Sequence, residues 1–287
     1  MEMADSGEKS LTILQAFYDP NDAVICNPEE PLLIHEKYGA LMSVKPGHIP
    51  AAKAFPLVAY SDLGSPYTLT MPSEDYFRKI ALEMDLRLSD TFVCYDAGGV
   101  NPSCRLAWTL KGFGAKNVHV LNGTLEKWIR DGGDLSTDYS LDFSARRSPV
   151  SAASGEFDFE LDKSMFIEYT DMTSAVKQIE DQYEKGLKRE QTIIDTKPPA
   201  TMGVPAAHKL PFTTLFNKDK TFRSEEQLKD MFYVYGGVGD PREDKVILSC
   251  QIGLSASTMC VAFSQLGNRN IRLYDGSYEE WESRARE

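Results

Sequence analysis

The stretches Thr91-Phe-Val-Cys-Tyr-Asp96 and Lys245-Val-Ile-Leu-Ser-Cys250 decide the fold, because the chain that follows the first also follows the second at the same spacing. A polar loop and an apolar helical stretch come next in each case, and they are followed by a glycine, a second glycine nine residues on, and a tryptophan five residues after that. Such a long match in spacing predicts two copies of one domain. The matched positions are Gly114, Gly123 and Trp128 in the first copy and Gly267, Gly276 and Trp281 in the second.

The correspondence continues upstream of these stretches. We pair Leu32-Leu-Ile-His35 with Thr192-Ile-Ile-Asp195, and Ile49-Pro-Ala-Ala52 with Val204-Pro-Ala-Ala207. The interval from the shared proline to the end of the quoted stretch is 46 residues in the first copy and 45 in the second. One extra residue is therefore present in the first copy, and we place it in the polar loop after Asp96.

Each copy alternates short β-branched runs with helical stretches, a pattern typical of an α/β fold. We expect two domains, 10–140 and 161–287, each with a mainly parallel sheet flanked by helices on both faces. The linker at 141–160 shows no sustained periodicity. In the second copy, Gly267 stands where a left-handed residue would end a helix. The two domains should superpose, with Cys250 at the mouth of the cleft between them.

The net charge and the cysteine content argue against several kinds of partner and site. The 287 residues include 31 Lys and Arg against 43 Asp and Glu, a net charge of −12 that argues against nucleic acid or a membrane as partner. Five cysteines without a C-x-x-C pair favour reduced thiols over a disulfide framework or a zinc site. Because no targeting pattern precedes the first copy, we expect a cytoplasmic protein, or a mitochondrial one if a transit peptide was removed.

Cys250 is the candidate nucleophile. It ends a predicted strand, and a helix is predicted to begin near Ser257. In a strand-loop-helix turn the loop amides and the helix N-terminus converge and can hold a negative charge, so a thiolate there would react at a lower pH than free cysteine. A buried apolar cysteine at a strand end is the alternative, but the matching residue is Asp96, which predicts one active and one structural copy. The active-site loop comprises Gln251, Ile252, Gly253, Leu254, Ser255 and Ala256, in which Gly253 allows a tight turn and Ser255 could donate to the sulfur.

Taken together, these residues resemble the tandem-domain sulfurtransferases of the rhodanese family. The resemblance runs from about Ala23 to Trp281 and depends on the order and spacing of several short motifs. These are Gly47-His-Ile-Pro-Ala-Ala52, Ser65-Pro, Tyr95-Asp96 and Val120-Leu-Asn-Gly123 in the first copy, and Asp195-Thr-Lys197, Leu210-Pro-Phe212, Cys250-x-x-Gly253-x-Ser255-Ala256 and Tyr274-Asp-Gly-Ser277 in the second.

The resemblance implies two rhodanese-like domains, the first non-catalytic, and sulfur transfer in two steps. The Cys250 thiolate would take the outer sulfur of a small anionic donor and become a persulfide. A thiol, either thioredoxin-like or of low molecular weight, or cyanide would then remove that sulfur. The resemblance implies neither a metal nor an organic cofactor.

The sequence departs from the family where the donor should bind. Gln251 and Ile252 match neither the basic pair of the thiosulfate-specific members nor the small pair of the mercaptopyruvate-specific ones. Lys197 stands where the family has arginine, and lysine cannot reproduce the two parallel hydrogen bonds of a guanidinium. Losing one such contact costs about 1.5–3 kcal/mol, so we expect a high KM, with 3-mercaptopyruvate favoured over thiosulfate. We interpret Lys197, Asp195 and Arg105 as donor contacts, with a solvated surface lysine as the alternative for Lys197 and a structural ion pair as the alternative for Arg105.

Other functions are compatible with parts of the sequence, and other residues have structural interpretations. The missing arginines favour a degenerate sulfurtransferase that carries a persulfide or binds a partner without efficient turnover. A phosphatase of this fold would need an arginine where Ala256 stands, and the flanking motif of papain-like proteases is absent. We interpret His48 as a structural hydrogen-bonding residue and Trp128 and Trp281 as packing residues. The spacing of His35, His119 and His208 does not indicate a metal site.

Overall fold

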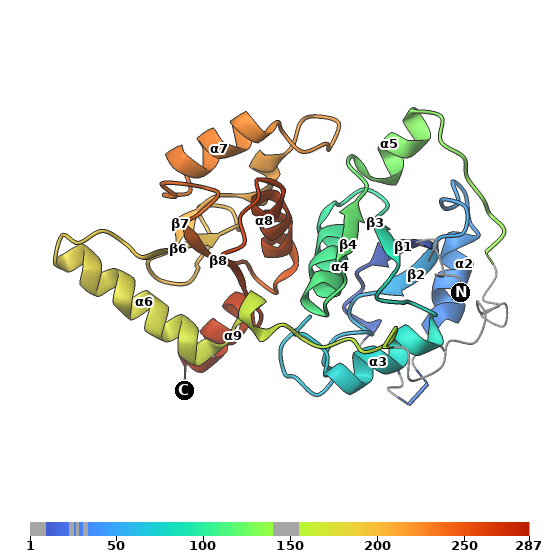
Figure 1. Ribbon diagram of the computed structural model, residues 1–287, viewed down its shortest axis with the longest axis horizontal. Coiled ribbons are helices and arrows are strands. Elements are labelled where there is room, and N and C mark those ends of the chain that lie inside the picture. Colours follow the sequence, from blue (N-terminus) through green and yellow to red (C-terminus); the bar gives the residue numbers. More distant parts are fainter. Residues whose placement is uncertain (1–9, 23–25, 27–28, 31–33, 140–154, 287) are drawn as a thin grey trace, which may run out of the picture.

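A computed structural model describes residues 10–22, 26, 29–30, 34–139 and 155–286, and it contains two sheets side by side (Figure 1). The strands are β1 (Leu11–Phe17), β2 (Lys53–Pro56), β3 (Thr91–Tyr95), β4 (Asn117–Val120), β5 (Phe166–Ile167), β6 (Gln191–Asp195), β7 (His208–Lys209), β8 (Lys245–Ser249) and β9 (Ile271–Tyr274). The first sheet has the order β2-β1-β3-β4 and the second β5-β9-β8-β6-β7. Neighbouring strands in both sheets are parallel, which confirms the expected α/β class.

Helices cover both faces of the second sheet. Along β6, Ile194 packs in a core cluster with α7 and α8, whereas its neighbour Ile193 packs in another with α6 and α9. Successive side chains of a strand point to opposite faces, so each face needs an apolar cover. No helix in the described ranges is long and apolar enough to cross a membrane. The helices are α2 (His35–Met42), α3 (Glu74–Glu83), α4 (Asn101–Gly112), α5 (Thr124–Arg130), α6 (Tyr169–Glu184), α7 (Glu225–Val234), α8 (Leu254–Gln265) and α9 (Ser277–Arg284), with short 3-10 turns η3 (Lys163–Met165) and η4 (Phe212–Leu215).

Strand pairing corrects one part of the predicted repeat. In the first sheet β1 pairs with β3 and places Gln15 opposite Tyr95, and in the second β6 pairs with β8 and places Asp195 opposite Ser249. The counterpart of β6 is therefore β1. Pairing Leu32–His35 with Thr192–Asp195 was wrong, because His35 begins α2; residues 31–33 lie outside the described part of the chain. A short apolar run does not distinguish a strand from a helix.

Unusual backbone conformations recur at matching positions of the two copies. Positive φ is uncommon for residues other than glycine, so its recurrence indicates that both copies make the same turns. The helix N-cap is the fourth residue after Asp96 but the third residue after Cys250. The extra residue of the first copy therefore lies in the loop after Asp96. The matching pairs are Ala51 (62°) with Ala206 (59°), Leu69 (61°) with Lys220 (65°), Val100 (63°) with Gly253 (78°), and Thr124 (64°) with Ser277 (51°).

The two halves meet along α4 and α8, which lie side by side at the centre of Figure 1. Thr258 of α8 donates from Oγ1 to Asn101 Oδ1 of α4 at 2.7 Å. The first part of the expected linker, through residue 154, lies outside the described residues. Phe159, in its last part, is buried in the core of the first copy. The exact domain limits stay a prediction.

Gly267→Ala tests the predicted helix end. Gly267 follows the C-cap of α8 with φ +91°, and a Cβ there would meet no atom within 4 Å. The only penalty is left-handed backbone strain, so the free energy of unfolding should fall by about 1–2 kcal/mol. Urea denaturation measures it. Gly114→Ala, at the matching position with φ +88°, should lose a similar amount, and unchanged stability in both variants would contradict the shared turn.

Candidate active site

Cys250 lies directly after β8, at the carboxyl end of the second sheet, the edge at which open α/β sheets bind ligands. Its carbonyl accepts a hydrogen bond from the Tyr278 amide, and the next carbonyl, that of Gln251, accepts one from Glu279, both at 3.0 Å. Cys250 is 2% exposed. The loop is therefore fixed on one side by the start of α9 and on the other by the left-handed N-cap Gly253 of α8.

The corresponding loop of the first copy holds a full negative charge. Asp96 Oδ1 accepts from the amides of Gly98, Gly99 and Val100 at 3.0, 2.7 and 2.9 Å, and its Oδ2 accepts from the Ser103 amide at 3.1 Å. Charge-assisted bonds of this kind are strong. We call the four amides that donate to this carboxylate, those of Gly98, Gly99, Val100 and Ser103, the Asp96 cradle. Both loops run from a strand end through a left-handed N-cap into a helix. The Asp96 cradle therefore supports an anion-holding role for the turn after Cys250.

The hydroxyl of Ser255 forms its hydrogen bond with Thr196 and not with the Cys250 sulfur. Its hydroxyl lies 2.9 Å from the hydroxyl of Thr196, the residue after β6. The Thr196 amide in turn donates to the Ser249 carbonyl at 2.9 Å. Ser255 thus ties α8 to the ends of two strands, and its expected hydrogen bond to Cys250 does not occur among the contacts of the described residues.

Lys197 approaches the loop from the end of β6. Its ammonium lies 3.3 Å from Gln251 Oε1 and 3.5 Å from the centroid of the Tyr278 ring. Burial lowers the pKa of Lys197, and the nearby Lys209 charge lowers it further, whereas Asp195 opposes the shift. Asp195 itself is fully buried: Oδ2 accepts from Lys209 Nζ at 2.7 Å and Oδ1 from the Lys197 amide at 2.9 Å. Asp195 therefore positions Lys197 and is neutralised by Lys209.

Arg105 reaches the loop from the other copy. Its Nη2 donates to Asp275 Oδ1 at 3.2 Å and to the Leu69 carbonyl, so the structural ion pair is present. Its Nη1 is buried and has no partner among the described residues. A Cβ placed on Gly253 would lie 3.0 Å from that nitrogen. Arg105 thus lies directly behind the turn that carries Cys250, and a side chain at Gly253 would press on its guanidinium.

Other loop residues connect the two copies. Ile252 and Leu254 pack against the core of the first copy, and Cys250 shares a buried cluster with Val100 and Cys104 of that copy. Gln251 is exposed, and Ala256 is buried inside α8. Cys250 is therefore at the boundary between the copies, as expected, but it is buried there rather than open to solvent at a cleft mouth.

Tyr18 is a residue near the site that sequence reasoning missed. Burial raises the pKa of its phenol most, and its electrostatic interactions with Glu279 and Cys250 raise it further. Tyr18 follows β1 directly. Its strand-end position is the signal that would have identified it once β1 had been recognised.

The remaining cysteines lie outside the loop that follows β8. Cys94, Cys104 and Cys260 are fully buried, and burial raises the pKa of each thiol. Burial also raises the pKa of the half-buried Cys26, whose Sγ donates to the Ala59 carbonyl. A raised thiol pKa leaves little thiolate at neutral pH. These four are therefore poor nucleophiles.

The other residues singled out make structural contacts. His48 is buried, its Nδ1 lies 2.9 Å from the Ile49 carbonyl, and its backbone pairs with Ser136. Trp128 donates to the Asp134 carbonyl at 2.9 Å, and Trp281 packs 5.6 Å from the Tyr169 ring. His208 lies against Arg189 and His119 is exposed on β4, whereas the side chain of His35 is outside the described part.

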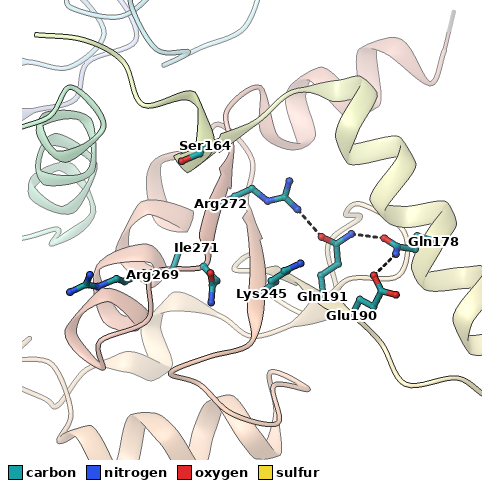
Figure 2. Close-up of a pocket in the computed structure, with 9 residues that line it drawn as sticks. Ser164, Gln178, Glu190, Gln191, Lys245, Arg269, Ile271 and Arg272 are labelled. Atoms are coloured by element: carbon teal, nitrogen blue, oxygen red, sulfur yellow. Dashed lines mark hydrogen bonds between the residues drawn. The ribbon is translucent and has the colours of Figure 1, made fainter.

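A polar hollow of about 390 Å³ lies at the opposite, amino-terminal edge of the second sheet (Figure 2). Figure 2 shows a chain of hydrogen bonds from Arg272 through Gln191 and Gln178 to Glu190, with lengths of 2.7, 3.1 and 2.9 Å. The hollow contains none of the predicted site residues. The chemistry of Cys250 belongs to the other edge.

Comparison with known proteins agrees with the internal repeat. The model of the rhodanese-like domain matches residues 35–131 and 178–284. The 3-mercaptopyruvate sulfurtransferase of Escherichia coli strain K12 is 28% identical over 255 residues, 83% of this chain and 82% of the relative. The thiosulfate sulfurtransferase of Gallus gallus is 26% identical over 270 residues, 87% and 83% of the two chains. The crystal structure of the Tum1 protein from Saccharomyces cerevisiae aligns with a TM-score of 0.73 at 21% identity, covering 98% of this chain and 91% of that one.

Asp96→Ala tests the cradle. Removing the carboxylate leaves four loop amides without their acceptor, so the free energy of unfolding should fall by about 2–4 kcal/mol. Denaturant unfolding measures the loss. Asp134→Ala, which removes an exposed carboxylate from the same copy, should change stability by less than about 0.5 kcal/mol. Equal effects of the two substitutions would show that the cradle holds no charge of structural importance.

Proposed function

The chain belongs to the family of rhodanese-like domain proteins, and from this membership we propose that Cys250 is the nucleophile with which it transfers sulfur. It is a sulfurtransferase of the 3-mercaptopyruvate and thiosulfate type. We assign the non-catalytic domain to 10–140 and the catalytic domain to 161–287. The observation that carries the proposal is the Asp96 cradle, which holds an anion at the place that Cys250 occupies in the second copy.

In the first step the Cys250 thiolate attacks the outer sulfur of the donor. A sulfur-sulfur bond forms as the donor's carbon-sulfur bond breaks, and the electron pair leaves on the carbon side as the enolate of pyruvate, which then takes a proton. With thiosulfate the leaving group is sulfite. The loop amides would stabilise the negative charge on sulfur during the displacement and on the resulting persulfide.

In the second step an acceptor thiolate attacks the outer sulfur of the persulfide. The new bond gives the acceptor's persulfide, and the bond that breaks returns the electron pair to the Cys250 sulfur as thiolate. Cyanide as acceptor would give thiocyanate. The first step oxidises the Cys250 sulfur to the persulfide while the leaving group takes the electron pair, and the second step reduces it back to the thiolate, so the protein is unchanged over the cycle and no further redox partner is required.

Donor binding involves few charged groups of this chain. Lys197 is the proposed contact for the donor's carboxylate, and Asp195 fixes its backbone. The unpartnered Nη1 of Arg105 supplies positive charge from behind Gly253. A monoanionic α-keto donor suits this arrangement better than dianionic thiosulfate.

A second candidate function is a persulfide carrier without efficient turnover of these donors. The deep burial of Cys250 and the existing contacts of the Lys197 ammonium favour it. Both candidates share the persulfide and differ in the rate at which it forms from small donors.

Cys250→Ser tests the nucleophile. After incubation with 3-mercaptopyruvate, mass spectrometry should find one added sulfur atom on Cys250 of the parent protein and none on the variant. Cys94→Ala, Cys104→Ala and Cys260→Ala should retain the addition, provided that circular dichroism shows them folded. Undiminished turnover in Cys250→Ser would exclude the proposed nucleophile.

Gln251→Arg tests donor choice. In the parent, kcat/KM should be higher for 3-mercaptopyruvate than for thiosulfate, because the exposed loop position beside Cys250 carries no cation. A guanidinium there should raise kcat/KM for thiosulfate about tenfold. Gln265→Arg makes the same charge change at the far end of α8 and should have no such effect. Ile252 is left unchanged because it packs against the first core. A parent that prefers thiosulfate would overturn this placement of the donor.

A further inference from the structure

We propose that Tyr278 is a positioning residue, whose ring holds the ammonium of Lys197 beside the Cys250 loop and so sets the affinity for the anionic donor. The inference rests on the proposed function of Cys250 and Lys197. It adds a residue to which no role has been given, and it concerns binding of the donor rather than the displacement at sulfur.

The geometry around Lys197 is specific. The ammonium lies 3.5 Å from the Tyr278 ring centroid, well inside the range of about 6 Å over which a cation is attracted to an aromatic face. Tyr278 is 8% exposed and Lys197 9%, so the contact is largely shielded from water. Shielding strengthens a cation-π contact, because less solvation of the ammonium has to compete with it.

The acidic group nearest to Lys197 in this site is already paired with another lysine, which leaves the Lys197 ammonium available to bind the donor's carboxylate. Asp195, whose Oδ2 is 4.0 Å from Lys197 Nζ, is already paired with Lys209 at 2.7 Å. Among the described residues, the other polar contact of the ammonium is the neutral amide oxygen of Gln251, at 3.3 Å. A donor carboxylate can replace that oxygen while the ring continues to hold the cation. The ring and the amide hold the ammonium without adding negative charge, beside the carboxylate of Asp195, which is shared with Lys209.

The first copy provides an internal comparison. By strand register Lys197 corresponds to Phe17, and by loop and helix position Gln251 corresponds to Ala97 and Tyr278 to Leu125. The Leu125 amide donates to the Asp96 carbonyl at 3.0 Å, as the Tyr278 amide does to that of Cys250. All three residues of the lysine site are therefore absent from the copy without a nucleophile. Leu125 also shows that this turn accommodates leucine.

Tyr278→Leu and Tyr278→Phe separate the ring from the rest of the side chain. Leucine removes the aromatic face, so KM for 3-mercaptopyruvate should rise about three- to thirtyfold with kcat little changed. Phenylalanine keeps the face and should keep KM within about twofold of the parent. In Lys197→Met, where the cation is already gone, adding Tyr278→Leu should raise KM no further. Tyr169→Leu removes the aromatic partner of Arg284, 4.9 Å away on α9, and serves as the matched control with unchanged KM.

A second readout does not depend on turnover. In the parent, the ε-methylene protons of Lys197, observed in protein carrying labelled lysine, should be shifted upfield by the ring current of Tyr278. The shift should persist in Tyr278→Phe and vanish in Tyr278→Leu. An unshifted resonance in the parent, or equal KM in the parent and a folded Tyr278→Leu, overturns the inference. Failure of Cys250→Ser to abolish transfer would instead overturn the proposed function and leave the NMR result standing.

Discussion

The buried ion pair between Arg105 and Asp275 joins the two domains and fixes the loop that carries Cys250. The Arg105 side chain is 3% exposed and that of Asp275 19%, and Asp275 also accepts from the Met71 amide at 2.7 Å. A charge buried at such a boundary is strongly destabilising once its partner is removed. Because Gly253 lies against the same guanidinium, the loop packs against a charge that the first domain supplies. The proposed nucleophile comes from one domain, but its surroundings come from both.

The duplication explains why the two domains fit each other. Each domain's turn after its last strand holds a segment of the other domain, through an oxygen-bearing side chain and a glutamate at matching positions. The contact made by the turn after β9 is therefore one of two related contacts, and the turn after β4 makes the other. In one half Asn122 accepts from the Phe222 amide and Glu126 pairs with Lys220; in the other Asp275 accepts from the Met71 amide and Glu279 accepts from Thr68.

The sequence was sufficient for the parallel fold and for placing Cys250 at a strand end, because repeated spacing and strand-end position are local signals. It was insufficient for β1, whose buried Thr12 and Gln15 gave that run a polar character. Both have distant partners: Thr12 donates to Asp90 at 2.9 Å, and Gln15 accepts from Tyr95 at 2.7 Å. A buried polar side chain whose hydrogen-bond partner is distant in the sequence is easily predicted to be exposed, because the sequence does not identify that partner. That mistake also hid Tyr18, and the surroundings of Lys197 depend on a ring 81 positions along the chain.

The carboxylate of Asp96 limits the effect that a substitution at this position can have. It occupies with four hydrogen bonds the place where a second nucleophile would have to stand. A cysteine placed there would have to satisfy those amides with a larger, softer atom, in a loop one residue longer than the one that carries Cys250. A single substitution of Asp96 by cysteine therefore does not reproduce the surroundings of Cys250.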